Sequence, residues 1–456
     1  MNTSKQRTSQ TWKDSPAISE YHDAKPHTTF DTGSLEDTHC EASNVDVLPE
    51  IDGGFDAWAY LASAWVIDCF VWGLPYSYGV LLDYYKKHDF QNSPGGHLAI
   101  VGTLSSGLPD FLSIAILPLL GRYPRIKRIC MMVGLGMEMG GTVGAAFATT
   151  AWQIILLQGV LTPLGSVLLW FPMMTYLFEW FDKRMGLASG ILLSGAGVGG
   201  VVFPLVTNAL LYRYGRRTTL LSVALTLFVC VLPCFRYLRP RRPSAHVDDP
   251  TTIPDPKSIR MKTLAILCVA NLIQASGNVI PRLYLHTFAS DMNISPTIGS
   301  LSIALLNGFS APGSIFLGYL SDRCGVRIAI LLSALGSAVA VFCIWGITPK
   351  SSVAPVLVFA AIHGFLSQGW SALWTRFASI SMTGKDPNLA SGLLSVYVAG
   401  GGLGIVLAGP ISTGLMHPWA LTNETSLAYG VEGYGPVIIY TGLALLSSGV
   451  GVAYGR

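Results

Sequence analysis

The stretch RPRRPSAHVDDPTTIPDPKSIR, residues 239–260, divides an otherwise apolar chain into two halves. Its prolines interrupt helices and its charges oppose burial in hydrocarbon, so we expect a polar connecting loop. Six apolar runs precede this loop and six follow it. Each run can cross a membrane, because a helix needs about 20 residues to span about 30 Å of hydrocarbon. The runs cover residues 57–85, 97–120, 129–149, 152–178, 186–211, 218–238, 262–290, 297–320, 327–347, 353–378, 388–414 and 434–453.

The pattern predicts an all-α integral membrane protein with twelve transmembrane helices in two six-helix bundles, residues 57–238 and 261–456. The composition supports this fold class. Of the 456 residues, 51% are hydrophobic and 12% are charged, and the charged fraction is about half that of a soluble domain. An ordinary soluble enzyme is therefore excluded. The net charge of +3 is too small for a chain of this length to indicate a nucleic-acid partner.

The first 56 residues are polar, mixed in charge and without apolar periodicity, which predicts a disordered tail. Lys and Arg near the ends of the apolar runs gather in the loops that share a side with both termini. Because such residues favour the cytosolic side, we expect a cytosolic tail and cytosolic termini. The plasma membrane is the expected location, although the charge count does not distinguish between cellular membranes. The sequon Asn423-Glu424-Thr425 falls on the opposite side and is a predicted glycosylation acceptor.

The two halves repeat each other in sequence. Leu187-Ala188-Ser189-Gly190 opens the fifth run, and Leu389-Ala390-Ser391-Gly392 opens the eleventh. Arg122 and Arg323 occupy equivalent loops, after the second and eighth runs. Related bundles of this kind are typical of transporters with a central binding site between the repeats.

The loop after the eighth run carries a distinctive motif. Residues 318–327 read GYLSDRCGVR, a G-x-x-x-D-R-x-G-x-R pattern. We expect Asp322 and Arg323, flanked by Gly318 and Gly325, to act in gating, because their charges can bind a neighbouring helix end in one conformation and release it in another. The alternative is a simple anchor of positive charge on the cytosolic side.

This motif, the division into six plus six runs and the repeat resemble the major facilitator superfamily. Two segments narrow the resemblance. Residues 52–58, DGGFDAW, are similar to the D-G-G-x-x-A-W signature of the fungal branch of the monocarboxylate porter family. Residues 180–190, WFDKRMGLASG, are similar to the segment of that family that leads into the fifth helix. The resemblance implies a secondary transporter that works by alternating access between two rocking bundles.

The residues that bind carboxylate in animal members of that family have no counterpart in this chain. Tyr76 stands where the resemblance places a Lys, Asn307 stands at the acid position, and Ala311 stands at the Arg position. An Arg placed slightly later would fall at Ser314. Lactate-like proton symport is therefore not carried over to this chain.

Other polar residues are candidates for a substrate site. Asn271, Gln274, Asn278 and Arg282 recur at helical spacing on the seventh run and form one polar stripe. Such a stripe either faces a water-filled cavity or bonds to another helix. We expect Arg282, with Asn278 and Gln274, to bind an anionic or strongly polar group of the substrate. Three residues of other runs complete the predicted site: Tyr76, Asn307 and Trp370.

Three carboxyl groups lie well inside apolar runs, away from the run ends: Asp68, Asp110 and Glu138. Ionised groups are costly in hydrocarbon and usually serve a function there. We expect Asp68 to exchange a proton during transport, with Glu138 as the next candidate. The alternative is that these groups only form hydrogen bonds between helices.

No cofactor or metal site and no enzymatic activity are expected. The glycine-rich stretches 195–200 and 400–404 lack the Lys-Ser/Thr of a phosphate loop and are interpreted as helix-packing surfaces. Two transport functions remain: export of a partly aromatic natural product, which is slightly favoured, and proton-coupled uptake of a small organic acid. A sensor without transport and a membrane enzyme are remote alternatives. We expect a monomer whose partners are a small-molecule substrate, the lipid bilayer and protons.

Overall fold

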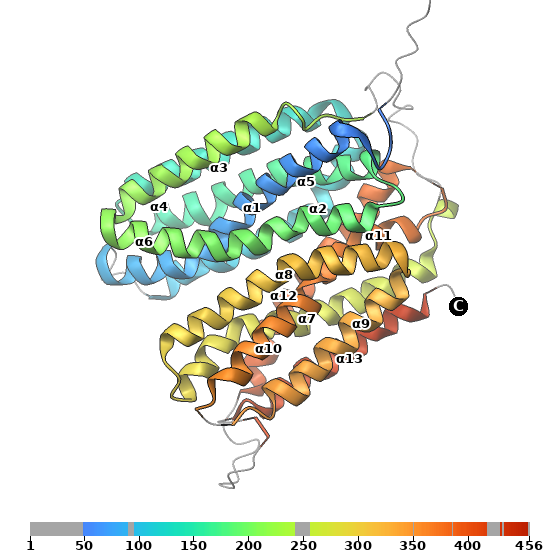
Figure 1. The fold of residues 1–456 in the computed structure, drawn as a ribbon. Helices are drawn as coiled ribbons and strands as arrows, with labels where there is room; N and C mark the ends of the chain where they lie inside the picture. The colour runs from blue at the N-terminus through green and yellow to red at the C-terminus, as the bar shows by residue number, and fades with distance from the viewer. Residues whose placement is uncertain are drawn as a thin grey trace, which may run out of the picture. The chain divides into compact units, whose positions relative to one another are not determined.

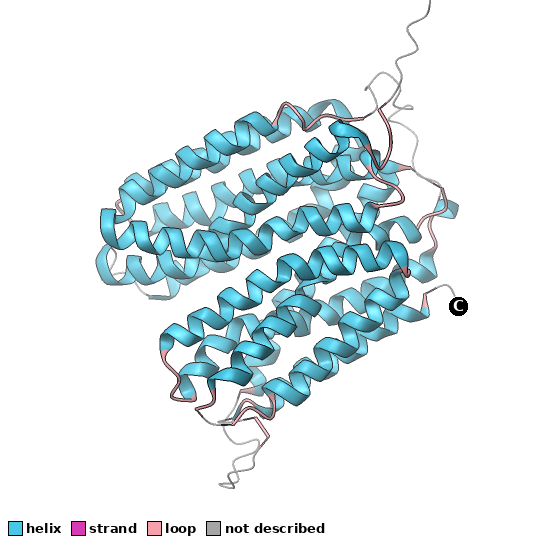
Figure 2. Cartoon of the chain, in the orientation of Figure 1, coloured by secondary structure: helices cyan, strands magenta, loops and turns pink. Residues whose placement is uncertain are grey.

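The computed structural model describes residues 49–89, 95–241, 256–349, 351–384, 386–416, 429–430 and 433–454. Within these ranges the chain is helical and has no strand, apart from one isolated bridge between Ile259 and Met382 (Figure 2). Asn423, most of the predicted tail and the centre of the 239–260 loop lie outside the described residues.

The first half of the chain forms helices α1 to α6. Helix α1 continues into the wider turn η1, and α4, η3 and α5 follow one another without a break in the chain. The bounds are α1 Gly54–Tyr84, η1 Tyr85–Asp89, α2 Gly95–Arg122, η2 Pro124–Ile126, α3 Lys127–Phe147, α4 Ala151–Ile154, η3 Ile155–Leu161, α5 Thr162–Trp180 and α6 Met185–Cys234.

Helix α6 covers both the fifth and the sixth predicted run. Gly215 interrupts it with φ 75° and ψ 172°, which is not a helical conformation. A positive φ is readily adopted by glycine because it has no Cβ. Gly215 therefore separates two helical segments that together form α6.

The second half forms helices α7 to α13. Helix α9 continues into η6, and the tenth predicted run is divided into α10, η7 and α11. The bounds are η5 Pro256–Ser258, α7 Met261–Asp291, α8 Pro296–Arg323, α9 Val326–Val339, η6 Ala340–Trp345, α10 Val353–Leu366, η7 Gln368–Leu373, α11 Trp374–Ile380, α12 Pro387–Leu415, α13 Gly435–Ser447 and η9 Ser448–Ala453.

The predicted all-α membrane fold is confirmed. Among the described residues, ten helical segments are long and apolar enough to cross a membrane, with α6 counted once. Each of the twelve predicted apolar runs lies on a helix or a helical segment. Figure 1 shows α1 to α6 gathered in one group and α7 to α13 in another.

The two groups of helices contact each other mainly through α6 with α8 and α2 with α12, and further through α6 with η7 and α11 and α5 with α12. Glycines make the first contact close. A Cβ on Gly318 would collide with the backbone carbonyl of Gly186, and a Cβ on Gly197 would lie 2.8 Å from the carbonyl oxygen of Asn307. Small residues of this kind let helix backbones approach one another. Gly392, the repeat of Gly190, has open space around its Cβ position, so the two LASG segments pack differently.

Candidate functional site

Asn271, the first residue of the polar stripe on α7, bonds to neighbouring helices. Asn271 Oδ1 accepts hydrogen bonds from Trp370 Nε1 at 3.0 Å and Trp374 Nε1 at 2.7 Å, and its Nδ2 donates to the Tyr397 carbonyl at 2.7 Å. Asn271 is fully buried and Trp370 is 1% exposed. In this conformation Trp370 therefore supports the helix packing, and its indole N–H is occupied by Asn271.

The middle of the stripe bonds to the break between α10 and η7. Gln274 Nε2 donates to the carbonyl oxygen of Ser367 at 3.1 Å, and Ser367 Oγ donates to Asn278 Oδ1 at 2.7 Å. Gln274 is buried, whereas Asn278 is half-buried. The stripe thus bonds to other helices from Asn271 to Asn278, and the half-buried Asn278 is the most exposed of these three residues. That the stripe also faces a water-filled cavity stays a prediction.

Arg282 is the last residue of the stripe, and among the described residues it has no acidic partner. Its Nη2 donates to Gln368 Oε1 at 3.0 Å, and its guanidinium carbon lies 4.8 Å from the centre of the Tyr76 ring. Asn278 Nδ2 reaches the same Gln368 oxygen at 3.4 Å. In the described part of the chain, no carboxylate forms an ion pair with Arg282, and Arg282 Nε and Gln368 Nε2 have no hydrogen-bond partner.

Tyr76 and Asn307 meet at a glycine of α6. A Cβ on Gly200 would lie 2.7 Å from Tyr76 Cδ2 and 3.2 Å from Asn307 Cγ. Asn307 Nδ2 donates to the Gly200 carbonyl at 3.5 Å, and Asn307 Oδ1 has no partner among the described residues. We use the name central polar cluster for the five residues that these contacts connect: Tyr76, Asn278, Arg282, Asn307 and Gln368.

The sequence analysis missed Gln368. The signal was present, because Ser367-Gln368-Gly369 is a polar break in an otherwise apolar run. The structure divides the helix at this point, between α10 and η7. Broken helices of this kind present polar groups at the midplane of transporters.

Asp68 is fully buried and accepts two hydrogen bonds from other helices. Trp170 Nε1 on α5 donates to its Oδ1, and the Ala196 backbone N–H on α6 donates to its Oδ2, both at 2.7 Å. Asp68 therefore connects α1 to the glycine-rich stretch of α6. None of the described cations forms an ion pair with this carboxyl.

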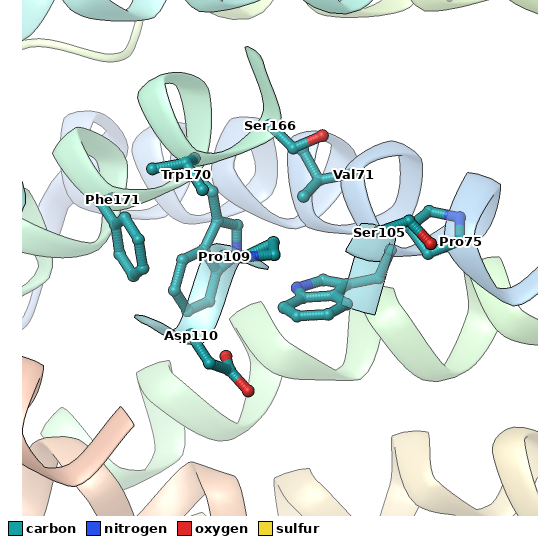
Figure 3. Close-up of a pocket in the computed structure, with 10 residues that line it drawn as sticks. Val71, Pro75, Ser105, Pro109, Asp110, Ser166, Trp170 and Phe171 are labelled. Atoms are coloured by element: carbon teal, nitrogen blue, oxygen red, sulfur yellow. The ribbon is translucent and has the colours of Figure 1, made fainter. Parts of the chain in front are cut away.

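The other two carboxyl groups of the apolar runs are Asp110 on α2 and Glu138 on α3. Asp110 lines a small pocket together with Ser105, Ser166 and Trp170 (Figure 3). Trp72 lines the same pocket. On its other side, Asp110 packs against Gly402 of α12, where a Cβ would lie 3.1 Å from Asp110 Cγ.

Glu138 is fully buried between α3 and α5. A Cβ on Gly165 of α5 would lie 3.0 Å from Glu138 Cα, so the two helices approach each other closely at this point. Among the described residues, neither carboxyl oxygen of Glu138 forms a hydrogen bond of good geometry, although the side chain of Ser166 on α5 interacts with this carboxyl.

Asp322 connects the two halves of the chain. Its carboxylate accepts the backbone N–H groups of Gly186 at 2.9 Å and Leu187 at 2.8 Å, at the first turn of α6. Arg376 Nε of α11 donates to Asp322 Oδ1 at 2.7 Å. The Arg376 guanidinium also donates to the carbonyl oxygens of Asp182 and Lys183, at 3.4 and 3.0 Å. Arg376 was not singled out from the sequence.

The other residues of the motif have different surroundings. Arg323 is exposed, and its guanidinium carbon lies 5.6 Å from the ring centre of Tyr319 on its own helix. Gly325 adopts φ 89° in the turn between α8 and α9. Gly318 packs on Gly186. Asp322 and Gly318 thus contact the first half. The cation that joins them there is Arg376 of α11, whereas the sequence suggested Arg323.

The equivalent loop of the first half has no acid that could contact α12. Gly121 lies beside Asn388 at the start of α12, where a Cβ would be 3.6 Å from the Asn388 carbonyl oxygen. The backbone N–H of Asn388 donates instead to Asp386 Oδ1 at 2.9 Å. The N-terminus of α12 is therefore capped within its own half, whereas that of α6 is bound by Asp322 from the other half.

Comparisons with known proteins agree with this architecture. The family model of the Major Facilitator Superfamily matches residues 61–266 and 264–433. The chain is 25% identical to the MFS transporter asaE of Aspergillus flavus, over 77% of this chain and 79% of that protein. It is 28% identical to MFS-type transporter 1 of an Ophiocordyceps species, over 72% of this chain and 73% of that protein.

A third relative is the Fujikurins efflux protein of Gibberella fujikuroi, which is 27% identical over 76% of this chain and 74% of that protein. The family model covers most of the chain, and these relatives are named as transporters of fungi. The chain belongs to the major facilitator superfamily and is a transporter of the type found in these fungal proteins.

Proposed function

We propose that this transporter moves a small organic solute that carries an anionic or strongly polar group, by alternating access around the central polar cluster. The observation that carries the proposal is Arg282, a cation whose described hydrogen-bond partner is the neutral amide of Gln368. An unneutralised guanidinium within a membrane protein favours a carboxylate, enolate or similar anion as its partner. Tyr76, whose ring covers the guanidinium, would contact the apolar part of the solute.

We favour export of a natural product as the direction of transport. The relative from Gibberella fujikuroi is named as an efflux protein. Arg282 also suits a small organic acid taken up with a proton, so the measurement below tests both directions. The segments 52–58 and 180–190, on which the resemblance to the fungal monocarboxylate porters rests, contact each other through Asp52.

We further propose that Asp68 carries the coupled proton. Its two hydrogen bonds come from α5 and α6, so the loss or gain of a proton at Asp68 changes how α1 is held against both helices. Glu138, which is fully buried between α3 and α5, is the second candidate. The proposed working form is a monomer in the plasma membrane, with the Asp322 end of the helices and both termini on the cytosolic side.

Flux of a panel of organic acids and hydrophobic metabolites into proteoliposomes, with and without a pH gradient, tests these proposals. Arg282→Ala should weaken substrate binding about tenfold to a hundredfold, because charge-assisted hydrogen bonds contribute roughly 1.5–3 kcal/mol. Asp68→Asn should abolish the dependence on the pH gradient yet permit exchange of substrate. Arg217→Ala is the matched control, since Arg217 also lies over an aromatic ring, that of Phe147 at 4.3 Å, but outside the cluster.

Two outcomes would count against the proposed roles. If Arg282→Ala and Arg217→Ala affect affinity equally, Arg282 does not contact the substrate. If Asp68→Asn retains proton-driven accumulation at the wild-type level, Asp68 only bonds helices together and Glu138 becomes the proton carrier to test. Net flux of any solute would eliminate the sensor and enzyme alternatives.

A further inference from the structure

The carboxylate of Asp52 holds three consecutive backbone N–H groups. Its Oδ1 accepts from Asp182 and Arg184, and its Oδ2 accepts from Lys183, each at 2.9 Å. The Asp52 N–H donates in turn to the Trp180 carbonyl at 3.0 Å. Asp52 has φ 61°, a left-handed conformation that Asp, Asn and Gly adopt at low cost.

Residues 49–58, which we call the N-terminal strap, are also fixed to Phe181 of the first half and to the start of the 239–260 loop. The Trp58 ring packs edge to face on Phe181 with 5.9 Å between the ring centres. Arg241 Nε donates to the Pro49 carbonyl at 2.8 Å, and Arg239 Nη2 pairs with Asp56 Oδ1 at 2.8 Å. The strap therefore moves with the first half of the chain.

The turn that Asp52 holds is the same turn that contacts the second half. The carbonyl oxygens of Asp182 and Lys183 accept hydrogen bonds from Arg376. Three residues after Lys183, the N–H groups of Gly186 and Leu187 donate to Asp322. Residues 182–187 thus have N–H groups bound by two carboxylates, Asp52 from their own half and Asp322 from the other half.

We propose that Asp52 is a positioning residue of the gate, because it holds residues 182–184 in one conformation. In that conformation the carbonyl groups of Asp182 and Lys183 bond to Arg376, and the start of α6 bonds to Asp322. The inference rests on the proposed gate at Asp322 and adds the N-terminal strap to it. Because Asp52 and the turn belong to the same half, their contact persists when the halves separate. Asp52 then keeps residues 182–184 ordered in both conformations. The two halves can therefore come together at Asp322 without the entropic cost of ordering this turn.

The charge state of Asp52 is consistent with this role. Burial alone would raise its pKa, but the hydrogen bonds from Arg184, Lys183 and Asp182 outweigh burial, and the net pKa is lowered. The carboxyl is therefore ionised near neutral pH, the form that accepts all three N–H groups.

Distances between spin labels test the proposal. One label is placed on Arg125→Cys, in the link between α2 and α3, and the other on native Cys324, which is exposed after α8. The other seven of the eight cysteines are replaced by Ser or Ala. Asp52→Asn and Asp52→Gly both tolerate the positive φ and remove the charge. The matched control is Asp56→Asn, a change in the same strap that affects the pair with Arg239 and leaves residues 182–184 untouched.

We expect Asp52→Asn and Asp52→Gly to increase the population with the longer label distance roughly fivefold, the lower end of typical coupling between sites. Asp322→Asn should give at least as large an increase, and Asp56→Asn should match the parent. If the Asp52 variants match the parent while Asp322→Asn does not, Asp52 only anchors the strap and the proposal is wrong. If Asp322→Asn also matches the parent, the gate itself is wrong. Asp52 variants that no longer elute as folded protein would show a role in folding and would likewise overturn the proposal.

Discussion

At the scale of single residues, two side chains that are adjacent in the sequence make different contacts. Asp322 and Arg323 are neighbours in the sequence, yet only the Asp322 carboxylate reaches α6, and its side chain is 8% exposed. Arg323 points to Tyr319 of its own helix. The cation that reaches the first half is Arg376, from a helix more than fifty residues further along the chain.

Asp322→Asn should slow transport by about tenfold and leave the KM for the substrate nearly unchanged. The variant loses a charge that binds two N–H groups and Arg376 but contacts no residue of the central polar cluster, so it changes a conformational equilibrium and not the binding site. The initial rate of flux in proteoliposomes as a function of substrate concentration measures both quantities. Arg376→Ala should behave in the same way.

Arg323→Ala is the control for the gate, because Arg323 is an exposed cation of the same motif. We expect it to transport at close to the wild-type rate. Equal slowing by Arg323→Ala and Asp322→Asn would mean that the positive charge of the loop matters more than its contact with α6. Wild-type rates in the Asp322 and Arg376 variants would favour the simple anchor.

At the scale of helices, Asn271 joins α7 to three neighbouring segments. Its amide bonds to Trp370 of η7, Trp374 of α11 and the backbone of Tyr397 on α12. A buried amide with all of these partners present fixes the register of α7 against the broken tenth run. Part of the polar stripe thus stabilises the bundle, and the part that ends at Arg282 is available for the proposed site.

Asn271→Ala should lower the thermal midpoint of unfolding in detergent by several degrees. The indole N–H groups of buried Trp370 and half-buried Trp374 and the Tyr397 carbonyl lose their partner, and an unsatisfied buried group costs about 1–3 kcal/mol. Fluorescence-detected thermal unfolding measures the change, with Thr287→Ala as a control on the exposed face of the same helix. The idea fails if the midpoint stays constant and substrate affinity falls, since Asn271 would then serve the binding site.

At the scale of the whole molecule, the two halves share a sequence repeat but make unequal contacts at the Asp322 end. The start of α6 is bound by Asp322 of the other half, and the start of α12 is capped by Asp386 of its own half. The missing acid after α2 explains the difference, because Gly121-Arg122-Tyr123 offers no carboxylate to α12. The structure therefore concentrates the polar contacts of the proposed gate at one of two equivalent places.

The orientation of the molecule can be tested in whole cells. Protease added to intact right-side-out cells should leave the 239–260 loop uncut, because its many cations favour the cytosolic side. An epitope inserted beside Asn423 should be accessible to antibody from outside, and Asn423 should carry glycan. Immunoblots of the cell-surface protein measure both. Cleavage of the loop together with a hidden epitope would reverse the proposed topology.

The sequence by itself determined the number, place and helical form of the apolar runs, because hydrophobicity, helix length and proline act over a few neighbouring residues. It also indicated which polar side chains are unusual, among them Asp68, Arg282 and Asp322. Only the tertiary structure decided their partners, because those partners are distant in the chain: Gln368 for Arg282, Trp170 and Ala196 for Asp68, and Arg376 and the start of α6 for Asp322. Such contacts depend on how whole helices pack: the glycine-rich stretches indicated that 195–200 and 400–404 would pack closely, but not against which residues.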